Sequence, residues 1–137
     1  VATGSIAIGI LIAEILKKPF IYVRPEPKAH GTGKQIEGMI LKKVPVVVIE
    51  DLISTGKSSL NAVEALQKNN IDVLGVFAIF SYGLEVAKIN FEKANQKFYS
   101  LSDFSTLLEC SKKHLDFSQD DIDKVNNWKK SPTNWIV

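Results

Sequence analysis

The sequence has 137 residues, a length typical of one domain that buries about 68% of the surface its unfolded chain exposes. Its formal net charge of +2 is too small to indicate a nucleic-acid or membrane partner, and we expect neither. The single cysteine, Cys110, excludes an internal disulfide framework, so we expect a buried structural thiol in a cytoplasmic, reducing compartment.

The longest apolar stretch, residues 6–16, is interrupted by Glu14 and is shorter than the ~20 residues that a membrane-spanning helix needs. No basic residues precede it and no small-residue cleavage site follows it, so we expect this stretch to be a helix of the fold and not a signal peptide. The chain starts with Val1 and leads at once into a glycine turn and an apolar helix. We therefore expect that an N-terminal part is missing.

Apolar helical periodicity alternates with short β-rich runs along the chain. The predicted strands are residues 20–24, 44–50, 73–80 and 97–101, with a long polar loop after the first of them. The predicted helices run from Thr3 or Ser5 to Lys17, over residues 58–68 and 84–94, and from Asp103 onward. Strands that are apolar at nearly every position need cover on both faces. The sequence thus predicts an α/β fold with a central parallel sheet flanked by helices.

The pattern changes at Ser118, where Ser118 and Asp121 stand at capping-box spacing before a charged helix. We expect two parts: a core over residues 1–117, whose N-terminal portion is missing, and a C-terminal helical appendage and tail over residues 118–137.

The stretch VVVIEDLISTGKSS, residues 46–59, joins an apolar strand, two carboxylates and a loop of hydroxyl residues around Gly56. In a parallel sheet, ligands bind beyond the carboxyl ends of the strands, where Glu50, Asp51 and this loop must lie. Backbone amides at the N-terminus of the following helix favour a phosphate. Carboxylates would repel a phosphate unless they face sugar hydroxyls or a bound divalent cation. A sugar phosphate satisfies both halves of the motif.

Three other interpretations of these residues are weaker. Helix capping alone accounts for Ser54 or Thr55, but not for two acids directly after the apolar run. A P-loop needs its first glycine at position 51, which is aspartate here. The glycines at positions 31 and 33 do not make a dinucleotide fingerprint, because no helix pattern follows them and position 36 is isoleucine.

The motif at residues 46–59 resembles the 5-phosphoribosyl 1-diphosphate (PRPP) binding motif of the type I phosphoribosyltransferases. The stretch YVRPEPKAHGTGKQIEG, residues 22–38, is similar to the mobile catalytic loop of the orotate phosphoribosyltransferase subfamily, which carries Arg, Lys and His in this order. GVFAIFSYGL and FYSLSDFSTLLE also resemble that subfamily. The resemblance therefore covers the chain from Val1 to about Cys110 and implies the type I phosphoribosyltransferase fold.

The resemblance implies a role for each matching residue. Glu50 and Asp51 would accept hydrogen bonds from the ribose 2- and 3-hydroxyls, and Ser54 would also reach orotate. Arg24, Lys28 and His30 would be the catalytic cations on the leaving diphosphate. The PRPP-binding segment implied by the motif is Glu50, Asp51, Leu52, Ile53, Ser54, Thr55, Gly56, Lys57 and Ser58, whose amides from Ser54 onward cradle the 5-phosphate. Gly4 and Tyr82 stand where other members place lysine and arginine.

The chemistry agrees with these roles. Breaking the bond between the anomeric carbon and diphosphate concentrates negative charge on the leaving group, which fixed cations and Mg²⁺ stabilise. We expect Mg²⁺ as the cofactor, held mainly by PRPP and water and by no direct protein ligand. A loop with several glycines can close over the site and exclude water. The resemblance further implies a homodimer in which each loop acts on the neighbouring subunit.

The expected function is transfer of phosphoribosyl from PRPP to orotate, a Mg-dependent pentosyl transfer that gives orotidine 5-phosphate and diphosphate in de novo UMP biosynthesis. Two alternatives remain open. Another phosphoribosyltransferase, acting on a purine or uracil, would share the sugar-phosphate motif. A regulator that senses PRPP without catalysis would also share it, although the presence of Arg24, Lys28 and His30 favours an enzyme.

Overall fold

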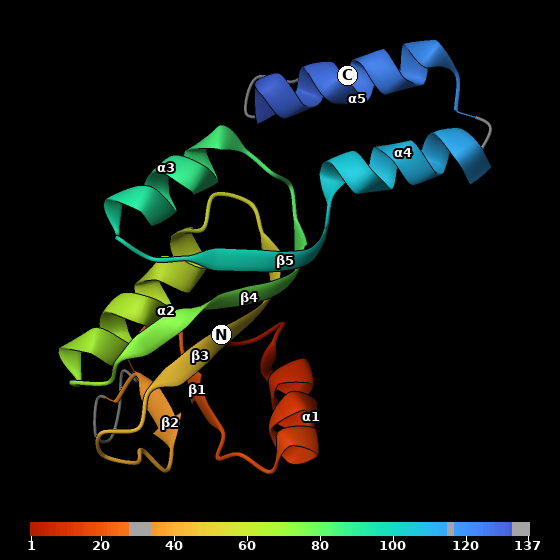
Figure 1. The fold of residues 1–137 in the computed structure, drawn as a ribbon. Helices are drawn as coiled ribbons and strands as arrows, with labels where there is room; N and C mark the ends of the chain where they lie inside the picture. Colours follow the sequence, from red (N-terminus) through yellow and green to blue (C-terminus); the bar gives the residue numbers. More distant parts are fainter. Residues whose placement is uncertain (28–33, 115–116, 133–137) are drawn as a thin grey trace.

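The structure is a computed structural model that describes residues 1–27, 34–114 and 117–132 (Figure 1). Its helices are α1 Ile6–Leu16, α2 Lys57–Lys68, α3 Glu85–Lys93, α4 Phe104–His114 and α5 Gln119–Lys130. Its strands are β1 Ile21–Val23, β2 Ile36–Gly38, β3 Val46–Ile53, β4 Val73–Ser81 and β5 Phe98–Asp103. These elements agree in type with the four strands and the helices predicted from the sequence, and β2 is added.

Three strands form a parallel sheet in the order β3-β4-β5. The register pairs Val48 with Val76 and Val76 with Phe98. Helix α2 connects β3 to β4, and α3 connects β4 to β5, so the predicted βαβ repetition and the α/β fold are confirmed (Figure 1). All three strands run in the same direction, which brings their carboxyl ends to one edge of the sheet.

The core lies between the sheet and α2. Val48, Val76 and Ala78 of the sheet and Val63 and Leu66 of α2 are buried there. On the opposite face, alternate residues are partly open: Val47 is 47%, Phe77 44% and Tyr99 51% exposed. The expectation that both faces are covered is therefore only partly met within the described residues, although α1 also contacts β3.

Strand β1 falls inside the predicted strand at residues 20–24 but pairs with β2 in a separate antiparallel hairpin. From the sequence, the residues of β2 are predicted to belong to a continuous polar loop. Ile36 explains the difference, because its side chain is buried in the core and fixes this part of the segment as a strand. The loop between the hairpin strands consequently ends before Ile36.

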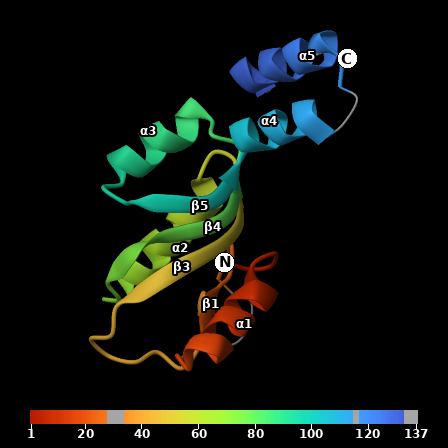
Figure 2. The ribbon, with the colours of Figure 1, turned by 45° about the vertical axis from the view of Figure 1, so that its right-hand side comes forward.

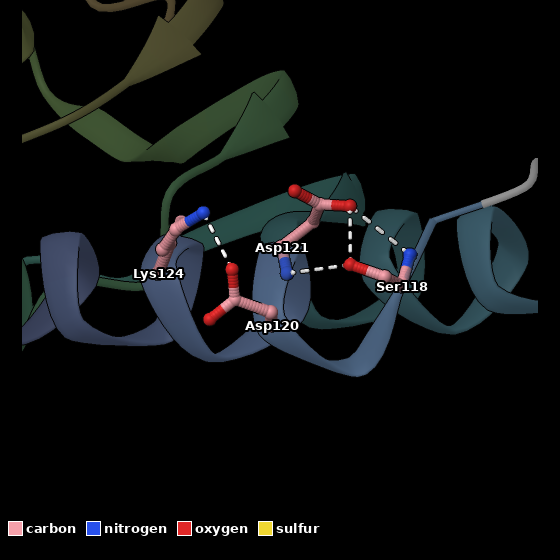
Figure 3. A network of polar contacts seen from close by, with 4 residues as sticks. All are labelled: Ser118, Asp120, Asp121 and Lys124. Carbon is pink, nitrogen blue, oxygen red and sulfur yellow. Dashed lines mark hydrogen bonds and ion pairs between the residues drawn. The ribbon is translucent and has the colours of Figure 1, made fainter.

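The predicted capping box at the start of α5 is confirmed. The Asp121 amide donates to Ser118 Oγ at 3.2 Å, and the Ser118 amide donates to Asp121 Oδ2 at 3.1 Å (Figure 3). One turn further, Lys124 pairs with Asp120 at 2.5 Å. The two contacts between Ser118 and Asp121 satisfy backbone donors that the first turn of a helix leaves unpaired.

Helices α4 and α5 lie side by side beyond the end of β5 (Figures 1 and 2). The Trp128 ring of α5 lies 5.4 Å from Tyr82 and 5.5 Å from Phe104, measured between ring centroids. This cluster joins α5 to Tyr82, which follows β4, and to the first residue of α4. The division into a core of residues 1–117 and an appendage of residues 118–137 stays a prediction.

The prediction that Cys110 is buried is wrong, because this thiol is exposed on α4. Its neighbour Ser111 is the buried residue, and its Oγ donates to the Leu107 carbonyl at 2.8 Å. One residue corresponds to about 100° of rotation in a helix, and this rotation turns Cys110 away from the side on which Ser111 is buried. Within the described ranges, no helix combines the length and hydropathy needed to cross a bilayer.

Candidate functional site

The loop after β3, residues 54–56, is anchored by the two neighbouring connections. The Tyr82 amide, just after β4, donates to the Ile53 carbonyl at 3.0 Å. Asn90 of α3 donates from Nδ2 to the Thr55 carbonyl at 3.0 Å. The loop is thereby fixed at the carboxyl edge of the sheet, which is the place that the sequence predicts for ligand binding.

Gly56 makes the turn into α2 with a φ of +78°, in the left-handed region that glycine adopts without strain. A Cβ at this position would lie 2.6 Å from Cε2 of Phe91. Both facts require glycine, as the sequence analysis expects. Ser54, Thr55, Lys57 and Ser58 are exposed around it. The first turn of α2 also leaves backbone N–H groups without partners in the helix, so the loop offers the donors that an anion needs.

Glu50 is buried, with 5% of its surface exposed. Its Oε2 accepts a hydrogen bond from Ser59 Oγ at 3.0 Å, and its Oε1 lies 3.2 Å from Ser5 Oγ. Burial raises the pKa of the Glu50 carboxyl, and the hydrogen bond from Ser59 acts in the opposite direction. This acid is held from two helices, by Ser5 in front of α1 and by Ser59 in α2.

Asp51 is exposed and differs from Glu50 in its surroundings. Its Oδ1 accepts the Leu52 amide at 2.9 Å. Its Oδ2 lies against Gly4, where a Cβ would approach to 2.0 Å. Any side chain at position 4 would therefore displace this carboxylate. Of the two acids, Asp51 is the more exposed.

The burial of Glu50 predicts a pH-dependent stability. Its folded pKa is raised above the unfolded value of about 4.3, so stability falls as pH rises from that value through the folded pKa. Glu50→Gln removes this titration while keeping an acceptor for Ser59. We expect the variant to gain in melting temperature relative to wild type, and to gain more at pH 7.5 than at pH 4. The exposed Glu109→Gln is the control, and an equal gain at both pH values would contradict the prediction.

The other predicted site residues are placed as follows. Ile53 is 1% exposed, so its side chain belongs to the core and only its backbone can face a ligand, whereas the Leu52 side chain is exposed. Arg24 follows β1, and its amide donates to the Gln35 carbonyl at 2.9 Å. Gln35 Nε2 donates back to the Arg24 carbonyl at 3.0 Å, which closes the base of the loop. Lys28 and His30 lie outside the described residues, so the three-cation site stays a prediction.

Sequence reasoning missed Ser5, Ser59 and Asn90. Ser59 is the last residue of the motif at residues 46–59, directly after the segment to which PRPP binding is assigned, and its helical position on the side facing β3 is the signal that could have identified it. Ser5 and Asn90 are 45 and 35 residues from their partners Glu50 and Thr55, so only the tertiary structure shows their contacts. In the part of the chain that the structure describes, no group of three His, Cys, Asp or Glu residues could hold a metal ion.

No model of a known protein family matches the chain. It is 44% identical over 135 residues to the orotate phosphoribosyltransferase of Cytophaga hutchinsonii, covering 98% of this chain and 65% of that protein. It is 47% identical over 131 residues to the orotate phosphoribosyltransferase of Bacillus subtilis, covering 96% of this chain and 61% of that protein. Over nearly its whole length the chain is thus similar to orotate phosphoribosyltransferases. It spans less than two thirds of these relatives' length.

Solved structures of phosphoribosyltransferases and of a UMP synthase share this fold. The orotate phosphoribosyltransferase of Aeropyrum pernix superposes with a TM-score of 0.66 at 28% identity, over 80% of this chain and 60% of that one. The UMP synthase of Leishmania donovani superposes with a TM-score of 0.77 at 24% identity, over 93% of this chain and 27% of that one. Because the identity to this UMP synthase is only 24%, its similarity shows the fold alone.

Proposed function

We propose that the protein is an orotate phosphoribosyltransferase, which transfers phosphoribosyl from PRPP to orotate and releases diphosphate, in the pyrimidine pathway to UMP. The observation that carries this proposal is the arrangement after β3. There an exposed carboxylate, Asp51, and the first turn of α2 lie at one strand end, as a sugar phosphate requires. The two relatives reported above, both orotate phosphoribosyltransferases, support the choice of acceptor.

In this proposal the residues after β3 bind the donor. Amides of residues 54–58 hold the 5-phosphate, while Asp51 and Glu50 accept hydrogen bonds from the ribose hydroxyls. Binding both ends of the sugar phosphate orients the anomeric carbon toward the acceptor and lowers the entropic part of the barrier. Ser54, exposed at the start of the loop, would reach the orotate.

Departure of diphosphate then needs positive charge. We assign this role to Arg24, Lys28 and His30 of the loop whose base is closed by the contacts between Arg24 and Gln35. Mg²⁺ would enter with PRPP, held by diphosphate oxygens and water, and would neutralise part of the leaving group's charge. Closure of the loop would exclude water from the reacting ribosyl carbon.

We further propose a cytoplasmic homodimer in which each loop completes the neighbouring site. A glycine-rich loop cannot hold its cations in place alone, and a second subunit offers a surface against which it can close. A purine or uracil acceptor, and PRPP sensing without catalysis, are the competing functions. The observations above favour neither of them over orotate.

The deciding experiment assays the full-length protein with PRPP and Mg²⁺ against orotate, uracil and adenine. We expect orotidine 5-phosphate and diphosphate to form in equal amounts, with no nucleotide from the other two bases. Product from uracil or adenine alone would reassign the acceptor. PRPP binding without turnover of any base would support the regulator.

Asp51→Asn tests the donor site. Asparagine retains the size of the side chain but removes the charge and one acceptor, so ribose hydroxyls are bound less well. We expect the free energy of PRPP binding to weaken by about 1–3 kcal/mol, which raises the Kd for PRPP about 5- to 150-fold. The melting temperature should not change. Asp72→Asn, at the amino end of the sheet just before β4, is the matched control. An unchanged Kd for PRPP in Asp51→Asn would remove this residue from the site.

A further inference from the structure

Ser59 joins the two halves of the candidate site. It is the third residue of α2, and only 1% of its surface is exposed. Its Oγ donates to Glu50 Oε2 at 3.0 Å. The first turn of α2 therefore contributes in two directions: its backbone amides face the loop, while the Ser59 hydroxyl reaches back to the end of β3.

Glu50 depends on this hydrogen bond. A carboxylate that leaves water loses favourable hydration unless donors inside the protein replace it. Ser5 is the other hydroxyl nearby, but its Oγ lies 2.5 Å from the Val1 carbonyl and 3.2 Å from Glu50 Oε1. A serine hydroxyl has one hydrogen, so Ser5 shares it between these two acceptors. Ser59 makes the shorter of the two hydroxyl contacts with Glu50, 3.0 Å against 3.2 Å.

The geometry also links the carboxylate to the phosphate loop. Ser59 lies three residues after Gly56, in the same helical turn whose amides would hold the phosphate. Any shift of this turn moves the hydroxyl that orients Glu50. The contact between Ser59 and Glu50 thus couples the acidic pair to the phosphate site, and the sugar that spans the two must match their separation.

We propose that Ser59 is a positioning residue for PRPP: its hydroxyl holds the Glu50 carboxylate in register with the phosphate loop, so that phosphate and ribose are bound together. The inference rests on the proposed function, because it takes PRPP as the ligand. It goes beyond that function by giving a role to a buried residue outside the segment of residues 50–58 to which the motif assigns PRPP binding.

The test compares Ser59→Ala and Ser59→Thr with wild type in the full-length protein. Binding of PRPP and of inorganic phosphate is measured separately, together with the KM for each substrate. Ser111→Ala is the matched control, because Ser111 is also a buried helical serine whose Oγ makes one hydrogen bond, to the Leu107 carbonyl. Melting temperatures show whether each variant is folded.

We expect Ser59→Ala to weaken PRPP binding by about 5- to 30-fold and to raise the KM for PRPP, while the affinity for phosphate and the KM for orotate stay within about twofold. Ser59→Thr retains the hydroxyl and should restore most of the PRPP affinity. Ser111→Ala should bind PRPP like wild type. A purely structural role for Ser59 would instead weaken phosphate and PRPP binding together.

The outcomes separate this inference from the function on which it rests. If wild type binds PRPP and Ser59→Ala binds it equally well, the positioning role is wrong and the proposed function stands. Equal losses for phosphate and PRPP, or a folded Ser59→Thr as weak as Ser59→Ala, also overturn the role. If wild type binds phosphate but not PRPP, the proposed function fails, and the inference fails with it.

Discussion

Lys28→Ala in the full-length protein is expected to lower kcat by about 10²- to 10³-fold, with a much smaller change in the Kd for PRPP. The reason is that the negative charge on the leaving diphosphate is larger in the transition state than in the ground state. In the proposed reaction Mg²⁺ would neutralise part of the diphosphate charge in the ground state, whereas in the transition state the diphosphate gains negative charge as its bond to the anomeric carbon breaks. A cation that acts mainly on this developing charge changes turnover more than binding.

Steady-state kinetics and direct PRPP binding, measured at saturating Mg²⁺, test this prediction. Lys34→Ala is the matched control, because Lys34 is a second, exposed lysine of the same segment to which we assign no contact with PRPP. We expect the Lys34→Ala variant to have the same kcat as the wild-type protein. A Lys28→Ala variant that loses affinity for PRPP but keeps its turnover would show that this lysine only attracts the substrate.

The site after β3 could be predicted because its signals are local. An apolar run followed by two acids fixes the end of a buried strand, and Gly56 is the residue that a left-handed turn needs. The structure places the turn there, with a φ of +78°. The Ser118 and Asp121 capping box is local in the same sense and is also confirmed.

The remaining features depend on contacts between distant segments. The sequence presents Glu50 and Asp51 as an equivalent pair. They differ because Ser5 and Ser59 surround the first, whereas the second lies beside Gly4 at the surface. The burial of Ile36, which makes β2 a strand, likewise has no local signal. These features arise from packing, which a pattern of neighbouring residues does not encode.

The unequal burial of the two acids has a functional meaning within the proposal. A buried carboxylate is destabilising, and the raised pKa of Glu50 expresses that cost. A sequence selected for stability alone would replace it with a neutral residue, as Glu50→Gln does. Stability given up at a ligand site is a common property of binding and catalytic residues. The burial of Glu50 therefore supports its place in the site.

Mixing Lys28→Ala with Asp51→Asn is expected to restore activity that neither variant has. If each loop acts on the neighbouring subunit, a heterodimer has one site with both defects and one with neither. Its activity should approach half that of a wild-type dimer. Random exchange at equal concentrations makes about half of the dimers heterodimers, so the mixture should reach about one quarter of wild-type activity.

The matched control is a mixture of Glu50→Gln with Asp51→Asn. Both residues lie at the end of β3 in one chain, so every site of that heterodimer still carries one defect and no activity should be gained. Subunit exchange is verified in both mixtures by recovering an untagged subunit with a tagged one. If exchange occurs and the mixture of Lys28→Ala with Asp51→Asn stays at the average of the two variants, each loop serves its own chain. The shared active site would then be wrong, while the assignment of Lys28 and Asp51 to one PRPP site would remain, because their separate defects measure that directly.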